Sequence, residues 1–464
     1  MNSIPANISE HLQMSEEIIM PGSNEYEAAR ALYNAMLDKR PGCIVRCTNV
    51  DEVVATINYA RDKDLLLAIR GGGHNGAGLG SCDGGLVLDT GAMKTITVDA
   101  EARTVSVEPG CTQGEVDTEA SRYGLAVPAG IVSTTGIAGL TLGGGHGYLS
   151  RQYGLTIDNL IEAEVVLANG SIVMANENEH ADLFWALRGG GGNFGVVTRF
   201  TFRAHPVAEV YAGPIFYDIA HAGEILRWYR DFLPTAPRKL SITLGIKTVP
   251  STAPFPEEIW GRRICALIVC YNGSEEDGMA AMAAVREATP EPLMDGMMQM
   301  PFVAMQGLFD GLLPKGLQWY WKGDFVEEIS DAAIADHIAH GSKSPSELSL
   351  MHLYPVDGAV HDVDAGETAW GGRTATWSMV IAGIDPDPAK AGALRDWAKG
   401  YWEAIHAHNR HGGAYVNFFS EDEDTARVKA SYGDNYARLA TVKRRYDPEN
   451  LFRVNQNIDP KDAS

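Results

Sequence analysis

The sequence predicts a two-domain α+β protein. Its 464 residues are more than one hydrophobic core usually organises. Strand-like apolar runs and glycine clusters fill the first 207 residues, whereas long helical runs separate the strand-like runs of residues 208–411. Strands and helices that do not alternate as regular βαβ units are typical of α+β architecture.

Short elements are predicted throughout the first part of the chain. Residues 48–51 have the composition of a helix start, and an apolar stripe runs from Val53 to Ala60. Asn169-Gly170 between two apolar runs is typical of a hairpin turn. We expect strands at residues 65–69, 86–88, 95–98, 104–107, 163–167, 172–174 and 195–202, and a helix at residues 113–122.

The second part predicts an antiparallel sheet backed by helices. Residues 241–248 and 265–271 are strand-like, and residues 276–288 and 389–407 are helical in pattern. The proline-rich residues 250–256 predict a loop, and no internal repeat is present.

Composition excludes several classes of partner. The formal net charge of −22 disfavours nucleic acid and anionic membranes. There is no apolar run long enough for a membrane span, and Met1–Gln13 shows no secretion signal. The six cysteines form no C-x-x-C motif, and Cys43 with Cys47 lacks the further ligands of a zinc site. We therefore expect reduced thiols in a cytoplasmic protein.

The loop from Arg70 to Gly76 carries a histidine, His74, inside a run of glycines. Gly71, Gly73 and Gly76 fit the dinucleotide-fold pattern G-x-G-x-x-G, which must open a helix. Residues 77–85 contain four glycines, each costing about 1 kcal/mol in a helix, so a crossover helix is excluded. The loop is instead predicted to bind phosphate through its backbone between two strands.

Two more glycine clusters follow, at residues 143–147 and 189–195. One such cluster is weak evidence for a ligand-binding loop, because it can be only a turn. Three clusters flanked by strand-like runs indicate one long ligand laid across several backbone loops, and a dinucleotide such as FAD has that shape.

These motifs resemble the FAD-binding domain of the vanillyl-alcohol oxidase / para-cresol methylhydroxylase superfamily. The C-terminal motifs are similar to those of its berberine-bridge-enzyme-like branch. The resemblance rests on residues 70–76, 128–130, 135–145, 153–160, 182–188, 193–198, 415–418, 446–452 and 455–458. It implies an FAD domain at residues 1–207 (core 38–207), a substrate domain at 208–411, and a segment, 412–464, that returns to the FAD domain.

The resemblance also implies the cofactor contacts. His74 matches a histidine bonded covalently to the flavin, and Val132 stands where many members carry a second, cysteine attachment, so one covalent link is expected. Val196 matches a contact near the adenine end, and Asn417 and Asn455 match positions that close over the isoalloxazine side. Other expected FAD contacts are Arg70, Gly71, Gly72, Gly73, Asn75, Gly76, Thr135, Gly136, Gly139, Gly143, Gly145, His146 and Gly147.

The catalytic base is less clearly indicated. Many relatives carry tyrosine at the position of Phe418, which cannot ionise, so Tyr153 is the expected base or substrate-orienting hydroxyl. Thr135 is expected to leave oxygen access to the flavin, because it is isosteric with the valine associated with that access.

Other candidates have plainer explanations beside the functional ones. Trp319, Trp321 and His352 are expected on strands facing the substrate side or in the core. His406, His408 and His411 resemble a metal tract, but a histidine at a helix end is the favoured interpretation, and no metal is expected. The acidic residues 421–424 are expected to be a solvated face.

The leading function is an oxidase that transfers hydride from a small organic substrate to FAD, with molecular oxygen as acceptor. An alcohol, amine, sugar or aromatic natural product all remain open as substrate. The alternatives are a dehydrogenase with another acceptor and a non-redox flavin-containing tailoring or binding protein.

Overall fold

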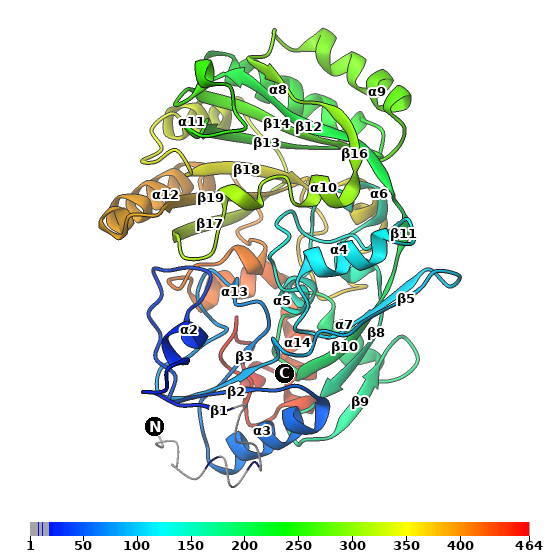
Figure 1. The fold of residues 1–464 in the computed structure, drawn as a ribbon, viewed down its shortest axis with the longest axis vertical. Coiled ribbons are helices and arrows are strands. Elements are labelled where there is room, and N and C mark those ends of the chain that lie inside the picture. The colour runs from blue at the N-terminus through cyan, green and yellow to red at the C-terminus, as the bar shows by residue number, and fades with distance from the viewer. Residues whose placement is uncertain (1–7, 9–11, 13–17, 464) are drawn as a thin grey trace.

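Four sheets make up the strands of the computed structural model, which describes Ile8, Leu12 and residues 18–463. Most of Met1–Gln13, where no secretion signal is predicted, lies outside these residues. An upper lobe in green and yellow stands on a lower lobe in blue, cyan and red (Figure 1). The α+β prediction is confirmed.

The lower lobe holds three small sheets. A four-stranded sheet has the order β1-β2-β4-β3, a five-stranded antiparallel sheet has the order β5-β6-β10-β8-β9, and β11 pairs with β7. The strands are β1 (Ile18–Ile19), β2 (Cys43–Arg46), β3 (Leu67–Arg70), β4 (Leu86–Asp89), β5 (Ile96–Asp99), β6 (Thr104–Val107), β7 (Leu125–Ala126), β8 (Leu160–Val166), β9 (Ile172–Ala175), β10 (Val196–Arg203) and β11 (His205–Pro206).

The helices of this lobe are short, apart from α3. Asn49 caps α3 by accepting from the Glu52 amide, and Thr112 with Glu115 forms a capping box on α4. The helices are α2 (Tyr26–Arg30), α3 (Val50–Asp62), α4 (Gln113–Ser121), α5 (Ile137–Gly143), α6 (Ser150–Tyr153), η1 (Thr156–Asp158) and α7 (Ala181–Leu187). The structure thus contains the two helices that the sequence predicts, each within a residue or two.

Parallel strands β3 and β4 are joined without a helix. Leu67 to Arg70 pairs in parallel register with Leu86 to Asp89, and residues 71–85 form only turns and bends. The loop between strands, rather than a dinucleotide-fold crossover, is confirmed. This leaves the histidine loop free to turn toward the upper lobe.

The upper lobe is built on one antiparallel eight-stranded sheet. The order is β15-β12-β14-β13-β18-β19-β17, with β16 also paired to β12. Its strands are β12 (Glu209–Asp218), β13 (Leu240–Thr248), β14 (Arg263–Tyr271), β15 (Met294–Asp295), β16 (Met298–Pro301), β17 (Gln318–Val326), β18 (Leu350–Pro355) and β19 (Trp377–Asp385).

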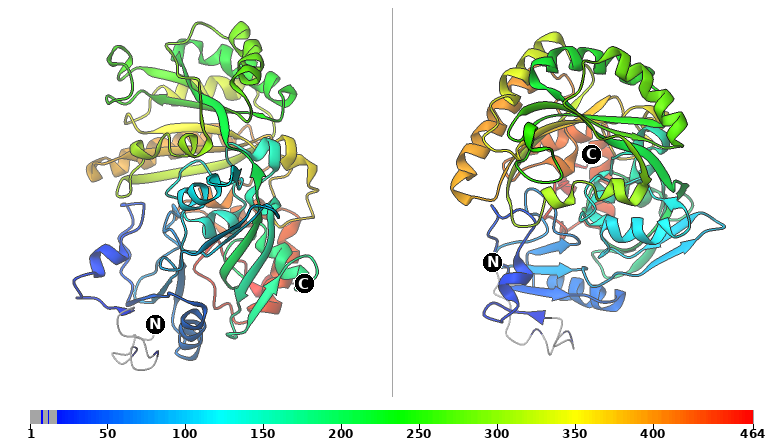
Figure 2. Two further views of the ribbon diagram at one scale, coloured as in Figure 1. Left: turned by 45° about the vertical axis from the view of Figure 1, so that its right-hand side comes forward. Right: turned by 45° about the horizontal axis from the view of Figure 1, so that its top comes forward.

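Long helices cover the outer face of this sheet, as the sequence predicts (Figures 1 and 2). Leu240, Ile242, Leu244 and Ile246 alternate along β13 and pack with those helices in one core cluster. The helices are η2 (Ile219–His221), α8 (Ala222–Phe232), η3 (Leu233–Thr235), η4 (Glu257–Ile259), α9 (Glu275–Ala288), α10 (Phe302–Gln306), η5 (Asp310–Leu312), α11 (Asp331–Gly341), η6 (Gly358–Asp362), η7 (Pro388–Lys390) and α12 (Ala391–His406). The other face of the sheet is therefore left for the lower lobe.

The C-terminal segment comes back to the lower lobe. It forms η8 (Val416–Phe418), α13 (Thr425–Tyr432), α14 (Asn435–Tyr446) and η9 (Pro460–Asp462). Lys443 of α14 is fully buried and donates to Asp447 and to the carbonyl groups of Asn193 and Phe452. These bonds join the tail to the third glycine cluster, and the boundaries at residues 207 and 411 stay a prediction.

Three of the four acidic residues 421–424 are exposed, as predicted: Glu421, Asp422 and Asp424. The exception is Glu423, whose side chain is almost completely buried against β17. Lys322 of β17 pairs with Asp422 and Glu423, and Asp424 caps α13. Burial of the Glu423 carboxylate is tolerable because Lys322 and Arg427 both pair with it.

No helix among the described residues is both long and apolar enough to traverse a bilayer. All six cysteines are buried and unpaired.

Candidate active site

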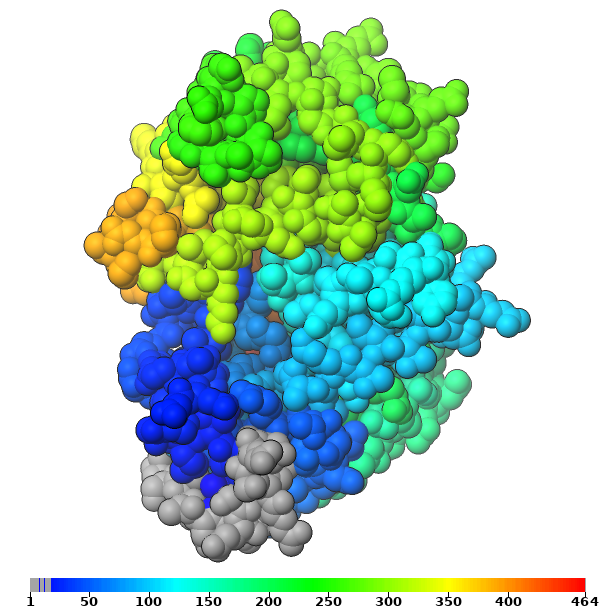
Figure 3. Space-filling view, viewed as in Figure 1, coloured from blue at the N-terminus to red at the C-terminus, as the bar shows by residue number. Residues whose placement is uncertain are grey.

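A deep cavity lies between the two lobes and reaches down into the lower one. Its walls come from the three glycine clusters, α5, the inner face of β17, β18 and β19, and the C-terminal segment. In the space-filling view, the yellow-green part of the upper lobe reaches down onto the blue part of the lower lobe (Figure 3). There Tyr33 donates to the carbonyl of Leu313, and Gly316 donates back to Tyr33.

Thirteen of the expected cofactor-binding residues line this cavity. They are Gly71, Gly72, Gly73, His74, Asn75, Val132, Thr135, Gly136, Gly139, His146, Val196, Asn417 and Asn455. At the centre, a Cβ atom on Gly72 would lie 2.5 Å from the amide nitrogen of Gly136, so only glycine permits the two loops to meet. The close approach leaves backbone, rather than side chains, facing the cavity.

Five of the expected contacts are not among the residues that line the cavity. Arg70 is held below the loop by Asp89, with 2.6 Å between the guanidinium and the carboxylate. The others are glycines because a neighbour occupies the space of a side chain: Trp321 beside Gly76, Asn417 beside Gly143, Thr156 beside Gly145 and the Ala129 carbonyl beside Gly147. These residues shape the loops that form the wall.

His74 is fixed from two sides. Its Nε2 lies 3.0 Å from Oγ1 of Thr134, and its ring stacks on Tyr33 with 3.7 Å between centroids. Burial, and then the charge of Lys315, lower the pKa of the imidazole to about 4, so it is neutral at pH 7. Nδ1 has no hydrogen-bond partner among the described residues.

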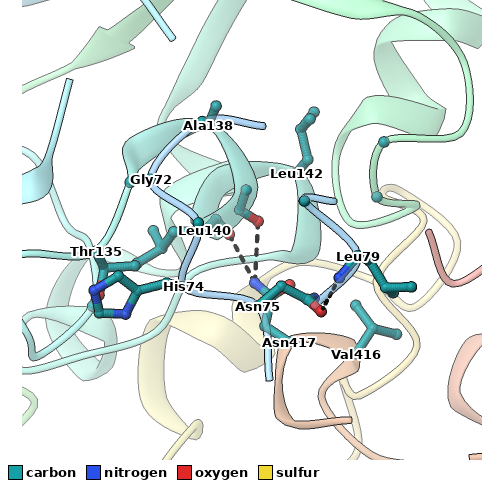
Figure 4. A pocket seen from close by; sticks show the side chains of 18 of the residues that line it. Gly72, His74, Asn75, Leu79, Thr135, Ala138, Leu140, Leu142, Val416 and Asn417 are labelled. Atoms are coloured by element: carbon teal, nitrogen blue, oxygen red, sulfur yellow. Dashed lines mark hydrogen bonds between the residues drawn. The ribbon is translucent and has the colours of Figure 1, made fainter. Parts of the chain in front are cut away.

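Val132 and Thr135 belong to the same wall. Figure 4 shows His74 and Thr135 together at one side of the pocket. The Thr135 amide donates to the Val132 carbonyl over 3.1 Å, closing a tight turn. The Thr135 hydroxyl makes no hydrogen bond within the part of the chain that is described, so it is not satisfied by its own loop.

The far end of the cavity is lined by polar groups without partners. The buried Oη of Tyr432, Oδ1 of Asn455 and Nε2 of Gln456 have no hydrogen bond, and all three residues line the cavity beside Val196. A buried polar atom without a partner costs about 1–3 kcal/mol, so these atoms are suited to a polar ligand.

The two tail asparagines contact different walls. Asn455 donates to the carbonyl of Gly192 in the third glycine cluster, whereas Asn417 donates to the carbonyls of Gly139 and Leu140 in α5. Figure 4 shows Asn417 directed at Leu140. The two asparagines therefore lie on different walls of the cavity, and their expected place on the isoalloxazine side stays a prediction.

The upper end of the cavity is aromatic. Trp319 and Trp321 of β17 lie edge to face with 5.5 Å between centroids, and both line the cavity, as the strand alternation predicts. His352 of β18 and Phe418 of η8 complete this wall. The cavity therefore has a polar lower end and a largely apolar upper end.

Tyr153 lies outside the cavity, which corrects the prediction that it is the base. It ends α6, stacks on His205 with 3.9 Å between centroids, and accepts from Asn272. Burial raises the pKa of its phenol, and the Asn272 hydrogen bond only partly offsets this rise. Tyr153 packs between the lobes instead of touching a ligand.

Tyr354 and Tyr33 are among the cavity residues that the sequence reasoning missed. Tyr354 shares the inner face of β18 with His352 at a spacing of two residues, so strand alternation could have found it. Tyr33, which stacks on His74, stands far from any motif and carries no such signal.

The three C-terminal histidines have separate partners. His406 contacts Asp324, His408 contacts Asp336, and His411 contacts the Gly371 carbonyl. Within residues 8, 12 and 18–463, no group of three or more His, Cys, Asp or Glu side chains is placed to hold a metal ion.

The cavity fits FAD. The open space before Gly139 and Gly192, where a Cβ atom would have no neighbour within 4 Å, gives a long ligand access to the backbone. The unpartnered polar atoms at the lower end suit the nucleotide part, and His74 stands near the upper end, where the lining becomes aromatic. Bound there, FAD would supply a two-electron acceptor beneath the aromatic wall.

This fold and cavity define an FAD-linked oxidoreductase, and comparison with known proteins agrees. One family model, described as an FAD binding domain, matches residues 41–176, and another, described as berberine and berberine like, matches residues 414–459. An FAD-linked oxidoreductase of Dictyostelium discoideum is 32% identical over 459 residues, which cover 98% of this chain and 97% of that protein. The chain therefore belongs to the berberine-bridge-enzyme-like family of FAD-linked oxidoreductases.

Solved structures show the same architecture over nearly the full length. 6-Hydroxy-D-nicotine oxidase from Arthrobacter nicotinovorans is 25% identical, with a TM-score of 0.86, 97% of this chain covered and 99% of the other. Physcomitrella patens BBE-like 1 is 26% identical, with a TM-score of 0.85, 97% of this chain covered and 98% of the other. The fold is that of the resembled superfamily.

Proposed function

We propose that this protein is an oxidase that oxidises a small organic substrate with FAD bound covalently through His74 alone, and that passes the electrons to molecular oxygen. The observation that carries the proposal is the placement of His74. A neutral imidazole stands at the cavity wall with one ring nitrogen held by Thr134 and the other without a partner.

This geometry suits bond formation to the flavin. A ring nitrogen must be unprotonated to bond to the flavin 8α-methyl carbon, which would lose one C–H bond, giving its proton to solvent and two electrons to the flavin ring. Burial keeps the His74 imidazole neutral. Stacking on Tyr33 restricts the ring to one orientation. Val132 lines the same wall and has no thiol, so it cannot supply a second attachment.

Oxygen use is supported by Thr135. Its small side chain lines the cavity close to His74, and the hydroxyl is not occupied by a hydrogen bond to the described residues. Because the Thr135 side chain is small, it leaves room for oxygen beside the flavin. The relative named 6-hydroxy-D-nicotine oxidase carries the word oxidase in its name, which agrees with the proposal.

A substrate-independent experiment tests oxygen use. The purified protein is reduced with dithionite, freed of excess reductant and mixed with air-saturated buffer in a stopped-flow instrument. An oxidase recovers the yellow oxidised spectrum within seconds. Recovery over many minutes, together with rapid oxidation by a quinone or dye, would favour a dehydrogenase instead.

A cytoplasmic location stays a prediction. Six buried, unpaired cysteines support it, because such thiols persist most readily in a reducing compartment.

A further inference from the structure

The upper end of the cavity has no side chain of fixed charge. Among the described residues that line the cavity, none is Asp, Glu, Lys or Arg. Leu313, Trp319, Trp321, Leu350, Val380 and Ala382 cover most of the upper wall. A cationic or anionic substrate would lose its hydration there without gaining an ion pair, whereas a neutral apolar molecule gains by burial.

Within this apolar wall stand two polar side chains joined to each other. His352 and Tyr354 lie two residues apart on β18 and so share its inner face. Nδ1 of His352 is 2.8 Å from Oη of Tyr354. A Cβ atom on Gly245, directly opposite on β13, would lie 2.7 Å from His352 Cδ2, so the glycine provides the space that the imidazole fills.

The neighbours of this pair favour one direction for its hydrogen bond. Burial, and then the charge of Lys247 on β13, lower the pKa of His352 to about 3, so Nδ1 can accept. Burial raises the pKa of Tyr354, so its hydroxyl keeps its proton and can donate. The other titratable groups near Tyr354 are His146, whose ring centroid is 5.2 Å away, and Tyr148.

Phe418 cannot act as a base in this wall. It stands where the resemblance implies an ionisable tyrosine, and its ring lies 5.8 Å from that of Tyr354. Tyr153 lies outside the cavity. His146 and Tyr415 also line the cavity, but Nε2 of His146 is held by Ser378, and the Tyr415 hydroxyl already accepts from Gly145 and Asn417. Tyr354 and His352 are therefore the protic pair that β18 places among the apolar residues of the upper wall.

We propose that the substrate is a neutral, largely apolar or aromatic alcohol, with Tyr354 as the catalytic residue that takes the hydroxyl proton and His352 as the positioning residue that receives the proton of Tyr354. This inference rests on the proposed function and names its substrate class. It also excludes, as principal substrates, cationic amines, carboxylates and oligosaccharides, which need charged or many polar partners.

The step balances as follows. The C–H bond of the alcohol carbon breaks, and the hydrogen leaves with the electron pair as hydride to the flavin. The O–H bond breaks, its proton passes to Oη of Tyr354, and the proton that Tyr354 held passes to Nδ1 of His352. A C=O bond forms, so an aldehyde or ketone is released, and His352 passes the proton on to solvent because burial disfavours its charged form.

Binding of unreactive probes tests the substrate class apart from turnover. The flavin-loaded protein is titrated with phenol, benzoate and benzyltrimethylammonium while the visible flavin spectrum is recorded. We expect phenol to bind at least tenfold more tightly than either ion. We expect Tyr354→Phe to weaken phenol about fivefold, because one hydrogen bond is lost, and the matched variant Tyr153→Phe to leave phenol binding unchanged. Tighter binding of either ion than of phenol would overturn the substrate class.

Anaerobic flavin bleaching tests the roles of the two residues. Benzyl, cinnamyl and 1-phenylethyl alcohols are mixed with wild type, Tyr354→Phe, His352→Gln and Tyr153→Phe. We expect Tyr354→Phe to slow bleaching at least 100-fold. We expect His352→Gln to slow it at least tenfold, with phenol affinity kept within twofold and the solvent deuterium isotope effect lost, which a merely structural role would not produce.

The outcomes separate the inference from the proposed function. Bleaching of Tyr354→Phe at the wild-type rate, or no bleaching of wild type by any of the alcohols, would overturn the inference. If the wild type still carries covalent flavin and is reoxidised by air after dithionite, the proposed function stands in either case. If Tyr354→Phe does not fold, the His352→Gln variant tests the role of the pair, and the probe titrations of the wild type test the substrate class.

Discussion

Gly72 and Gly136 press their backbones together at the centre of the cavity. A Cβ atom on Gly72 would lie 2.5 Å from the Gly136 nitrogen, well inside van der Waals contact. The contact joins the histidine loop to the turn that carries Val132 and Thr135. It therefore sets the distance between His74 and Thr135, the residue proposed to govern oxygen access.

Gly72→Ala should disturb this junction. The added methyl group would collide with the backbone of Gly136, so one of the two loops must move. We expect flavin content, measured from the ratio of flavin absorbance to protein absorbance, to fall by more than half. Gly392→Ala in α12 is the control, because a Cβ atom there meets nothing within 4 Å. Full flavin content in Gly72→Ala would show that the loops can separate without consequence.

Thr135→Leu should slow reoxidation by oxygen. The larger side chain fills the space beside the flavin, and we expect a decrease of at least tenfold, or about 1.4 kcal/mol in the barrier. Thr135→Val, which keeps the volume, should react as wild type does. Stopped-flow mixing of the reduced variants with air-saturated buffer makes the comparison, and equal rates for wild type and the leucine variant would remove Thr135 from oxygen control.

Arg151→Met should destabilise the junction of the lobes. The guanidinium of Arg151 in α6 is buried, lies 2.7 Å from Asp357, and donates to carbonyl groups near residues 233–240. Its removal leaves the Asp357 carboxylate buried without its cation, which costs about 3–5 kcal/mol. Arg238→Met, which removes the exposed pair with Asp362, should cost less than about 1 kcal/mol. Urea denaturation of both variants measures the difference.

Stability should fall in mild acid, in part because of His337. Burial chiefly lowers the pKa of His337 to about 3, and its Nδ1 lies 2.9 Å from the Tyr401 hydroxyl. Below the unfolded pKa of about 6.5 the unfolded chain takes up a proton that the folded protein refuses, so folding is disfavoured as pH falls. The expected contribution is about 2 kcal/mol at pH 5 and none above pH 7.

His337→Gln should therefore flatten the pH dependence of the unfolding free energy between pH 7 and pH 5. His221→Gln, at an exposed position, is the control and should follow the wild type. A curve for His337→Gln that runs parallel to the wild-type curve would contradict the assignment.

Local patterns predicted most of the elements and the side of the fold that carries the site. The strand-like run of β13, the alternation of Trp319 and Trp321 in β17, the Asn49 cap and the Asn169-Gly170 hairpin depend on neighbouring residues, so the sequence reveals them. The glycine loops likewise predicted the cavity wall.

Contacts distant in sequence could not be predicted. Tyr33 stacks on His74, which lies 41 residues further along the chain, and no sequence motif marks Tyr33. A glycine can face a ligand or a packed side chain, and only the fold decides which. Gly76 faces Trp321 of β17, which comes 245 residues later in the chain. The burial of Glu423 likewise follows from Lys322 on another lobe.

The intact mass of the denatured protein tests the central claim most directly. The wild type, unfolded in acid and desalted, should show the mass of the polypeptide plus one FAD, and its precipitate should stay yellow. His74→Ala should show the polypeptide mass alone and release any flavin into the supernatant, while His205→Gln, outside the cavity, should keep the added mass. Flavin-loaded wild type at the bare polypeptide mass would contradict covalent attachment through His74.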